Sequence, residues 1–154
     1  MVNGSPYIGD HGRSGEFGHI CVHPGGLRCR CGQLGCLEAY CSSARLSSDL
    51  GITVERFFEE LQQGNLSYQM LWKDYLSHLA VALANIRMSF DCDIVLGGYL
   101  SQYLQPFLKD LRSLTAARDP FGTDGTFIYL CKYPKHAAPL GAALQFIDRF
   151  LKEL

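Results

Sequence analysis

Apolar residues in the middle of the chain recur with the spacing of a helix. Successive members of the series are four, four, four and three positions apart, so they line one face over several turns. The series consists of Leu71, Tyr75, Leu79, Leu83 and Ile86. We predict a long helix, capped by Ser67, that packs this stripe into a core, with Tyr68 and Trp72 as further packing residues.

Four other segments have helical patterns or helical end signals. They span residues 37–50, 54–63, 101–117 and 137–154. Gly51 and Gly64 follow two of them as stop signals, Thr53 precedes the second as an N-cap, and Pro139 falls in the first turn of the last.

Short apolar runs between turn residues predict the strands. They are residues 1–8, 20–22, 93–98 and 126–133. Strand and helix alternate in the second half, which predicts a mostly parallel sheet with helices packed against it, in an α/β fold. The glycine-rich stretches 9–18 and 24–36 are predicted to be loops.

Composition favours an ordinary soluble domain. The chain has 154 residues, is 47% hydrophobic and 19% charged, and carries a formal net charge of -1. It has no basic stripe, so we expect no direct contact with nucleic acid. It also has no leader pattern and no long apolar run, so we expect no membrane contact and a cytoplasmic location.

The cysteines favour a metal site over disulfides. There are seven, an odd number, and four of them lie within sixteen residues. One candidate ligand set is His19, Cys29, Cys31 and Cys36. Three thiolates and an imidazole suit tetrahedral zinc, and a site with four protein ligands leaves no place for an activated water, so the metal would be structural.

Spacing alone leaves two alternatives open for this site. His23 or Cys21 could replace His19 as the fourth ligand. The cysteines could also be free, partly buried thiols, as we expect for Cys92 and Cys131, which lie far from the cluster and are predicted to be core residues.

Two linked motifs surround the candidate ligands. The first is Gly15-Glu16-Phe17-Gly18-His19. The second runs from Cys29 to Glu38 as Cys-Arg-Cys-Gly-Gln-Leu-Gly-Cys-Leu-Glu. Together they resemble the signature of the ROK family, which comprises bacterial repressors and sugar kinases. A chance match over this length is improbable. The segments 94–98 and 139–143 also resemble the family's glycine turn near the adenosine site and its last helix.

The resemblance implies the C-terminal lobe of an actin-like, ribonuclease-H-like fold. Residues 1–154 would form a single lobe with a zinc loop at about 19–36, without an N-terminal lobe or a DNA-binding domain. Glu16, His19 and Glu38 match family residues that hydrogen-bond sugar hydroxyls. His19, Cys29, Cys31 and Cys36 match the zinc ligands, so His19 would bind zinc through one ring nitrogen and sugar through the other.

Departures from the kinase pattern shape the functional hypothesis. The family's aspartate-glycine phosphate loop and Asn-Asp catalytic pair do not occur here, so we predict no kinase activity for this chain alone. Tyr99 also replaces a glycine that lets the nucleotide approach the backbone.

Our first hypothesis is therefore a sugar-sensing fragment of a transcriptional regulator, similar to the N-acetylglucosamine repressor type. The alternative is the equivalent lobe of a sugar kinase, for which alone ATP and Mg²⁺ would be cofactors. A third hypothesis is a zinc-stabilised interaction module. In each case we expect a homodimer.

Overall fold

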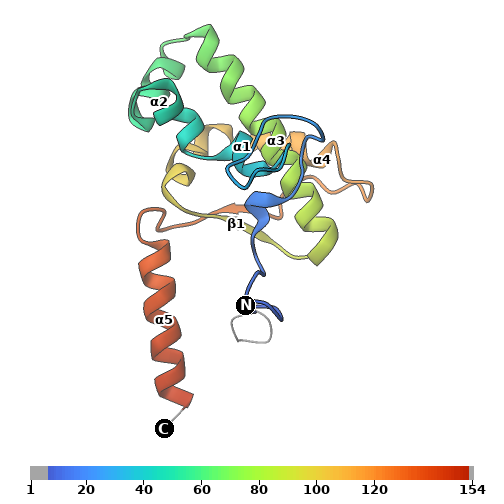
Figure 1. Cartoon of the computed structure of the whole chain (residues 1–154), viewed down its shortest axis with the longest axis vertical. Coiled ribbons are helices and arrows are strands. Elements are labelled where there is room, and N and C mark those ends of the chain that lie inside the picture. Colours follow the sequence, from blue (N-terminus) through green and yellow to red (C-terminus); the bar gives the residue numbers. More distant parts are fainter. Residues whose placement is uncertain (1–6, 153–154) are drawn as a thin grey trace. The chain divides into compact units, whose positions relative to one another are not determined.

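The fold was analysed in a computed structural model that describes residues 7–152 (Figure 1). The contacts divide the chain into two compact units, with the division between Ala82 and Leu83. Each unit is described by itself. The strand predicted at residues 1–8 lies almost wholly outside the described residues, and Tyr7 and Ile8 have no regular structure.

The first unit combines a long loop with a helical hairpin. The loop begins after a short 3-10 helix, η1, and leads into α1. Its elements are η1 (Phe17–His19), α1 (Leu37–Cys41), η2 (Ala44–Leu46), η3 (Ser48–Leu50), α2 (Val54–Gln62) and α3 (Leu66–Phe90), which continues into the second unit. Residues 20–22, predicted to be a strand, contribute only an isolated bridge at Cys21.

Aromatic side chains form the core of the hairpin of α2 and α3. Phe57 is fully buried, and its ring meets those of Phe58 and Tyr68 edge-on at centroid distances of 5.3 and 5.1 Å. Trp72 packs edge-on against Phe58 at 5.0 Å and stacks on Tyr75 at 4.9 Å. Aromatic pairs of this kind add to the free energy gained from burial.

The ends of the two hairpin helices test the predicted caps. The side chain of Thr53 accepts a hydrogen bond from the backbone N–H of Arg56, as predicted for the start of α2. The cap of α3 is Asn65, whose side-chain oxygen accepts from the N–H of Ser67 at 3.1 Å, so the assignment of Ser67 as the cap was wrong. Both are short polar side chains that satisfy an unpaired N–H group.

The helix predicted at 37–50 is broken into three short pieces. Ser42 is extended, with ψ of 157°, and its hydroxyl accepts a hydrogen bond from the N–H of Arg45. The hydroxyl of Ser47 donates to the carbonyl of Ser43. Serine side chains that bind nearby backbone groups compete with the helical pattern, which explains the interruption.

The predicted stripe on α3 is only part of its buried surface. Tyr75 and Leu83 are buried as predicted, whereas the other members of the series are half-buried. Trp72, Leu76 and Ala80, spaced four residues apart, are buried as well. The helix therefore buries a face wider than the stripe.

The second unit contains a parallel strand pair and the remaining helices. Its elements are β1 (Ile94–Leu96), η4 (Tyr99–Tyr103), η5 (Gln105–Phe107), α4 (Leu108–Ala116), β2 (Ile128–Leu130) and α5 (Ala137–Lys152). Ile94 pairs with Ile128 and Leu96 with Leu130 in a parallel register, as predicted. Arg112 of α4 donates to the carbonyl of Ile128 and so ties this helix to the sheet.

Two expectations for the second unit were wrong. The helix predicted at 101–117 begins as two 3-10 turns and becomes α-helical only at Leu108, because Pro106 has no N–H group to donate within a regular helix. Cys92 is exposed and Cys131 half-buried, so neither is a core thiol.

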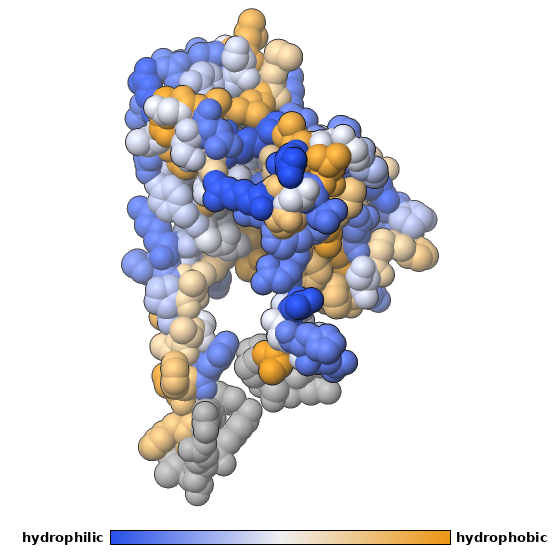
Figure 2. All heavy atoms as spheres, in the orientation of Figure 1, coloured by the Kyte–Doolittle hydropathy of each residue, from blue (hydrophilic) through white to orange (hydrophobic). Residues whose placement is uncertain are grey.

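The last helix, α5, leaves much apolar surface exposed (Figure 2). Its exposed large side chains are Leu140, Leu144, Phe146, Ile147, Phe150 and Leu151. Across the described residues, no helix combines the length and the apolar character needed to cross a membrane.

Candidate functional site

Backbone hydrogen bonds fold the loop between η1 and α1 back on itself. The carbonyl of Gly35 accepts from the N–H groups of Val22 and His23 at 2.8 and 3.2 Å. The N–H of Leu37 donates to the carbonyl of Ile20 at 2.9 Å. Gly35 has φ of +83°, and a Cβ there would lie 2.0 Å from the carbonyl oxygen of His23, so this position requires glycine.

The tip of the loop is a tight turn that presents two cysteines. The N–H of Cys29 donates to the carbonyl of Gln33, and the N–H of Gly32 donates to the carbonyl of Cys29. Gly32 adopts φ of +90°, which favours glycine. The turn brings Cys29 and Cys31 close to Cys36, which precedes the first residue of α1.

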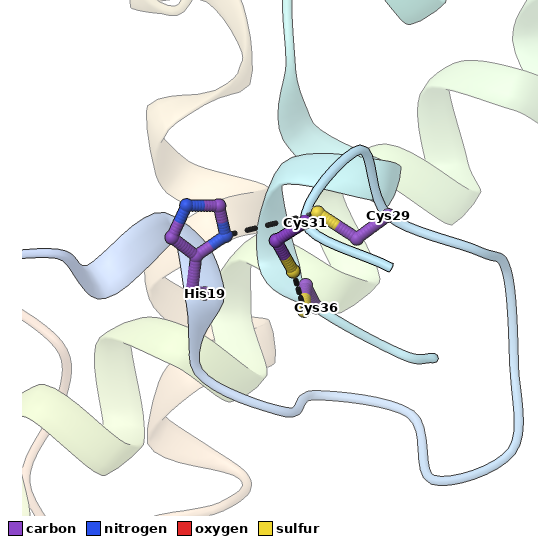
Figure 3. A group of neighbouring side chains, drawn as sticks. All are labelled: His19, Cys29, Cys31 and Cys36. Atoms are coloured by element: carbon purple, nitrogen blue, oxygen red, sulfur yellow. Dashed lines mark hydrogen bonds between the residues drawn. The ribbon is translucent and has the colours of Figure 1, made fainter. Parts of the chain in front are cut away.

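Four side chains converge to form a candidate metal site (Figure 3). The ligand atoms of His19, Cys29, Cys31 and Cys36 all lie within 4.8 Å of one another. Cys29 and Cys36 are buried, whereas His19 and Cys31 are exposed. We refer to residues 19–36 as the metal loop.

The distances between the ligand atoms fit tetrahedral zinc. The sulfurs of Cys31 and Cys36 are 3.7 Å apart, and the sulfur of Cys29 is 3.7 Å from Nδ1 of His19. Bonds of 2.0 to 2.3 Å arranged as a tetrahedron require separations of about 3.8 Å between two sulfurs and about 3.6 Å between sulfur and nitrogen. These two separations therefore fit a tetrahedral ion, and the remaining ligand atoms lie within 4.8 Å of one another.

The two alternative ligands lie elsewhere. The ring of His23 faces His78 on α3, with its Nδ1 3.1 Å from Nε2 of that residue. Cys21 is exposed, and its sulfur lies 4.0 Å from the carbonyl oxygen of Leu34. The arrangement therefore favours His19 as the fourth ligand.

The thiols of the cluster differ in their tendency to ionise without a metal. Burial, together with the neighbouring thiols of Cys31 and Cys29, raises the pKa of Cys36 to about 12. A hydrogen bond from the backbone of Gln33 is the main cause that lowers the pKa of Cys31. A bound divalent cation would hold both as thiolates.

The predicted sugar-binding residues lie at the edge of the cluster. An oxygen of Glu38, on α1, is 3.6 Å from Nδ1 of His19 and 3.5 Å from the sulfur of Cys29. The side chains of His19 and Glu38 are 42% and 37% exposed, so both remain accessible to a ligand. Glu16 is the residue before η1; its side chain is exposed and makes no capping hydrogen bond, and its carbonyl accepts from the N–H of His19.

The turn after β1 is the counterpart of the predicted nucleotide region. Gly97 packs closely, since a Cβ there would lie 3.6 Å from the Cβ of Cys131. Gly98 has φ of +81° and precedes η4. Tyr99 begins η4 with its side chain 41% exposed and its ring edge-on to Tyr103.

The structure also brings together residues that the sequence did not link. His23, Tyr40 and His78 form a group of neighbouring rings beside the metal loop. They are separated by up to 55 positions. The spacing of residues within one segment does not predict such a group. The one hint in the sequence is His78, a polar residue among the apolar residues of α3.

The fold and site define an α/β protein with a loop of one histidine and three cysteines at the start of a short helix. The family model of the ROK family matches residues 1–149. The chain belongs to the ROK family. This confirms the resemblance noted in the two motifs.

Known proteins of this family show how much of the fold is represented. An N-acetyl-D-glucosamine kinase of Salmonella paratyphi B is 32% identical over 67% of this chain and 40% of its own length. An N-acetylmannosamine kinase of Yersinia pestis is 27% identical over 64% of this chain and 36% of its own length. The chain thus spans about two fifths of these relatives.

A solved structure confirms the fold class. The ROK hexokinase from Thermus thermophilus superimposes with a TM-score of 0.79 at 26% identity, over 90% of this chain and 49% of that one. The chain therefore has the actin-like α/β architecture expected from the sequence.

Proposed function

We propose that this chain is the sugar-binding lobe of a ROK-family protein, with zinc as a structural ion. The observation that carries the proposal is the position of Glu38, whose carboxylate lies 3.6 Å from the imidazole of His19 at the edge of the four-ligand cluster. A carboxylate and an imidazole side by side, both accessible, match the alternating acceptors and donors of adjacent sugar hydroxyls.

Zinc would give each side chain its role. With Nδ1 of His19 bound to the metal, Nε2 carries the proton and can donate to a hydroxyl. Glu38, and Glu16 from the start of η1, would accept hydrogen bonds from hydroxyls. Zinc with four protein ligands has no open position, so its contribution is the shape of the loop and the tautomer of the histidine.

For the whole protein we favour a sugar kinase. The relatives are named as kinases of N-acetylglucosamine and N-acetylmannosamine, and the solved neighbour as a hexokinase. This reverses the order of our two hypotheses from the sequence. In this case ATP and Mg²⁺ are cofactors, and the phosphate-binding and catalytic groups come from the part of the family fold that this chain does not span.

A sugar-sensing regulator is the second candidate function. Tyr99 supports it, because its large side chain stands at the turn after β1, where the family's kinases carry a glycine close to the nucleotide. A regulator of this kind needs the sugar site and no nucleotide. In both candidates we propose a cytoplasmic protein that associates as a homodimer. None of the seven cysteines, all of which lie in the described part of the chain, forms a disulfide, which suits a reducing compartment, and the exposed apolar surface of α5 suits association.

Calorimetric titration of the zinc-loaded chain with N-acetylglucosamine, N-acetylmannosamine and glucose tests the sugar site. Glu38→Gln should weaken binding by about tenfold or more, because one charge-assisted hydrogen bond becomes a neutral one. Glu59→Gln, an exposed carboxylate on α2, is the matched control and should bind like wild type. Equal affinity of the Glu38 variant would remove this residue from the site.

The kinase and regulator candidates differ in their use of ATP. The gene product that carries this chain should convert ATP and an N-acetylhexosamine to ADP and sugar phosphate if it is a kinase. If it is a regulator, it should bind the sugar without turning over ATP. Tyr99→Gly should then leave its response to the sugar unchanged, because that response needs no bound nucleotide. Turnover at enzymatic rates would eliminate the regulator.

A further inference from the structure

A group of rings joins the metal loop to the long helix α3. The ring of Tyr40 stacks on that of His78, with centroids 3.9 Å apart and planes inclined by 20°. The ring of His23, from the metal loop, lies 5.6 Å from the Tyr40 centroid and nearly parallel to it. Tyr40 belongs to α1 and is only 4% exposed. The metal loop, α1 and the more distant helix α3 therefore meet at one buried ring.

The hydroxyl of Tyr40 forms a hydrogen bond with the backbone of the metal loop. It accepts from the N–H of Leu27 at 2.7 Å. The approach is close enough that a Cβ on Gly26 would lie 2.0 Å from the hydroxyl oxygen. Leu27 lies two positions before Cys29, and Tyr40 two positions after Glu38. The bond is thus a cross-link between the backbone that carries the first thiol ligand and the helix that carries the sugar-site carboxylate.

The two histidines make a hydrogen bond with each other, and this geometry excludes a second metal site in the present arrangement. Their nitrogens are 3.1 Å apart, while their ring centroids are 5.4 Å apart and their planes differ by 16°. Because the ring centroids are far apart while the two nitrogens are close, the rings must meet end-on, with the nitrogen of one facing the nitrogen of the other. In this arrangement the lone pairs of the two nitrogens would point at each other along one line, so the two nitrogens cannot both bind one metal ion at about 2 Å.

A hydrogen-bond acceptor on the other side of the His78 ring determines which nitrogen carries the proton when His23 and His78 are both neutral. Nδ1 of His78 lies 2.9 Å from the carbonyl oxygen of Asp74, which can only accept. Nδ1 therefore carries the proton, Nε2 accepts, and Nδ1 of His23 is the donor to it. The carboxylate of Asp74 lies 3.3 Å from the same Nδ1 and also binds Arg45 at 2.8 Å.

We infer that Tyr40 is a positioning residue for the metal and sugar site, and that the histidine pair formed by His23 and His78 holds it on α3. This inference rests on the proposed function of the metal loop. Tyr40 is not one of the four ligands; it acts through the backbone of Leu27 and through α1. Without its hydroxyl, the N–H of Leu27 loses its acceptor, and the spacing of Cys29 and Glu38 is no longer fixed.

Cobalt titration of the whole chain tests the role of the hydroxyl. Co²⁺ bound to three thiolates gives absorption bands that report a tetrahedral site. Tyr40→Phe keeps the stacked ring and removes only the acceptor, so the variant should remain folded but bind Co²⁺ about tenfold or more weakly, with altered bands. Tyr68→Phe, which removes a hydroxyl from the aromatic core of the hairpin, is the matched control and should bind like wild type.

The outcomes separate the inference from the proposed function. A wild-type chain that takes up no Co²⁺ overturns the metal site itself. Uptake by wild type with an unchanged affinity and spectrum in Tyr40→Phe overturns the positioning role and leaves the metal site intact. Weakened uptake in Tyr40→Phe alone, with the same circular dichroism and melting temperature as the Tyr68→Phe control, supports it.

Imidazole NMR tests the histidine pair without metal or sugar. The tautomer of His78 should carry its proton on Nδ1, and replacement of His23 by alanine should shift the Nε2 signal of His78. A proton on Nε2 of neutral His78, or an unchanged signal in His23→Ala, would show that the pair is not formed and would overturn this half of the inference.

Discussion

The metal loop and the helical hairpin of α2 and α3 belong to the same unit but are stabilised by different means. The hairpin buries large aromatic rings, with Phe57 fully inaccessible. The metal loop buries none of its large aliphatic residues fully: Leu27 is 43% exposed and Leu34 51%, and Ile20 and Val22 are half-buried. Burial of apolar area can thus account for the hairpin, whereas the loop depends on backbone hydrogen bonds and on four ligand side chains.

The two regions should therefore differ in how far their folding depends on the metal. A structural ion contributes its binding free energy directly to the folded form of the segment that it holds. The hairpin should have no such requirement, because its aromatic contacts involve none of the four ligand side chains. Removal of the metal should therefore loosen the loop while the hairpin remains packed.

Loss of a metal ligand should produce the largest effect. Cys31→Ser replaces a thiolate by a hydroxyl that zinc binds poorly, so the chain should lose stoichiometric zinc, and with it stabilisation on the order of 10 kcal/mol at the loop. Elemental analysis and the melting temperature measure the change. Cys92→Ser, an exposed cysteine outside the cluster, is the control and should keep both. Full zinc content in Cys31→Ser would refute the ligand assignment.

A cavity in the hairpin should have the next largest effect, and a different signature. Phe57→Ala removes a fully buried ring that packs against three other aromatic residues, Phe58, Tyr68 and Trp72, so it should lower the free energy of unfolding by about 3 to 5 kcal/mol. Urea unfolding followed by circular dichroism measures this loss. Zinc content of the folded fraction should stay stoichiometric. Phe121→Ala, at a ring that is 78% exposed, serves as the control.

The hairpin was largely predictable from sequence because helical periodicity and end signals are local. Thr53 and the glycines at 51 and 64 were identified from neighbouring residues alone. The break at Ser42 was not, since serine hydroxyls fit either helix or turn, and their choice depends on the surrounding contacts. The start of α3 was placed two residues late, because Asn65 and Ser67 are both good caps.

The metal loop was predictable in composition but not in geometry. Cysteine clustering gave the ligand candidates, yet spacing could not choose between His19 and His23. That choice depends on His78, 55 positions away from His23, which engages the ring of the second histidine. Tyr40 likewise could not be linked to Leu27, because the cross-link depends on how the loop folds back between Gly26 and Gly35. Contacts of this range are set by the tertiary fold.

A change of pH should have a smaller effect, and it should act on the metal loop and not on the hairpin. In the metal-free chain, burial raises the pKa of Cys36 to about 12, so its thiol is protonated at neutral pH, whereas the zinc-bound form is a thiolate. Zinc binding must then release this proton, and affinity should fall by about tenfold for each pH unit of acidification per proton released. Competition with a chelating dye from about pH 8 to about pH 6 measures the slope. The hairpin signal in circular dichroism should stay constant over the same range, because its core contains aromatic rings that do not titrate there.

A zinc affinity independent of pH would mean that the buried thiol is not a ligand, and parallel loss of the hairpin would show that the two regions are not stabilised separately.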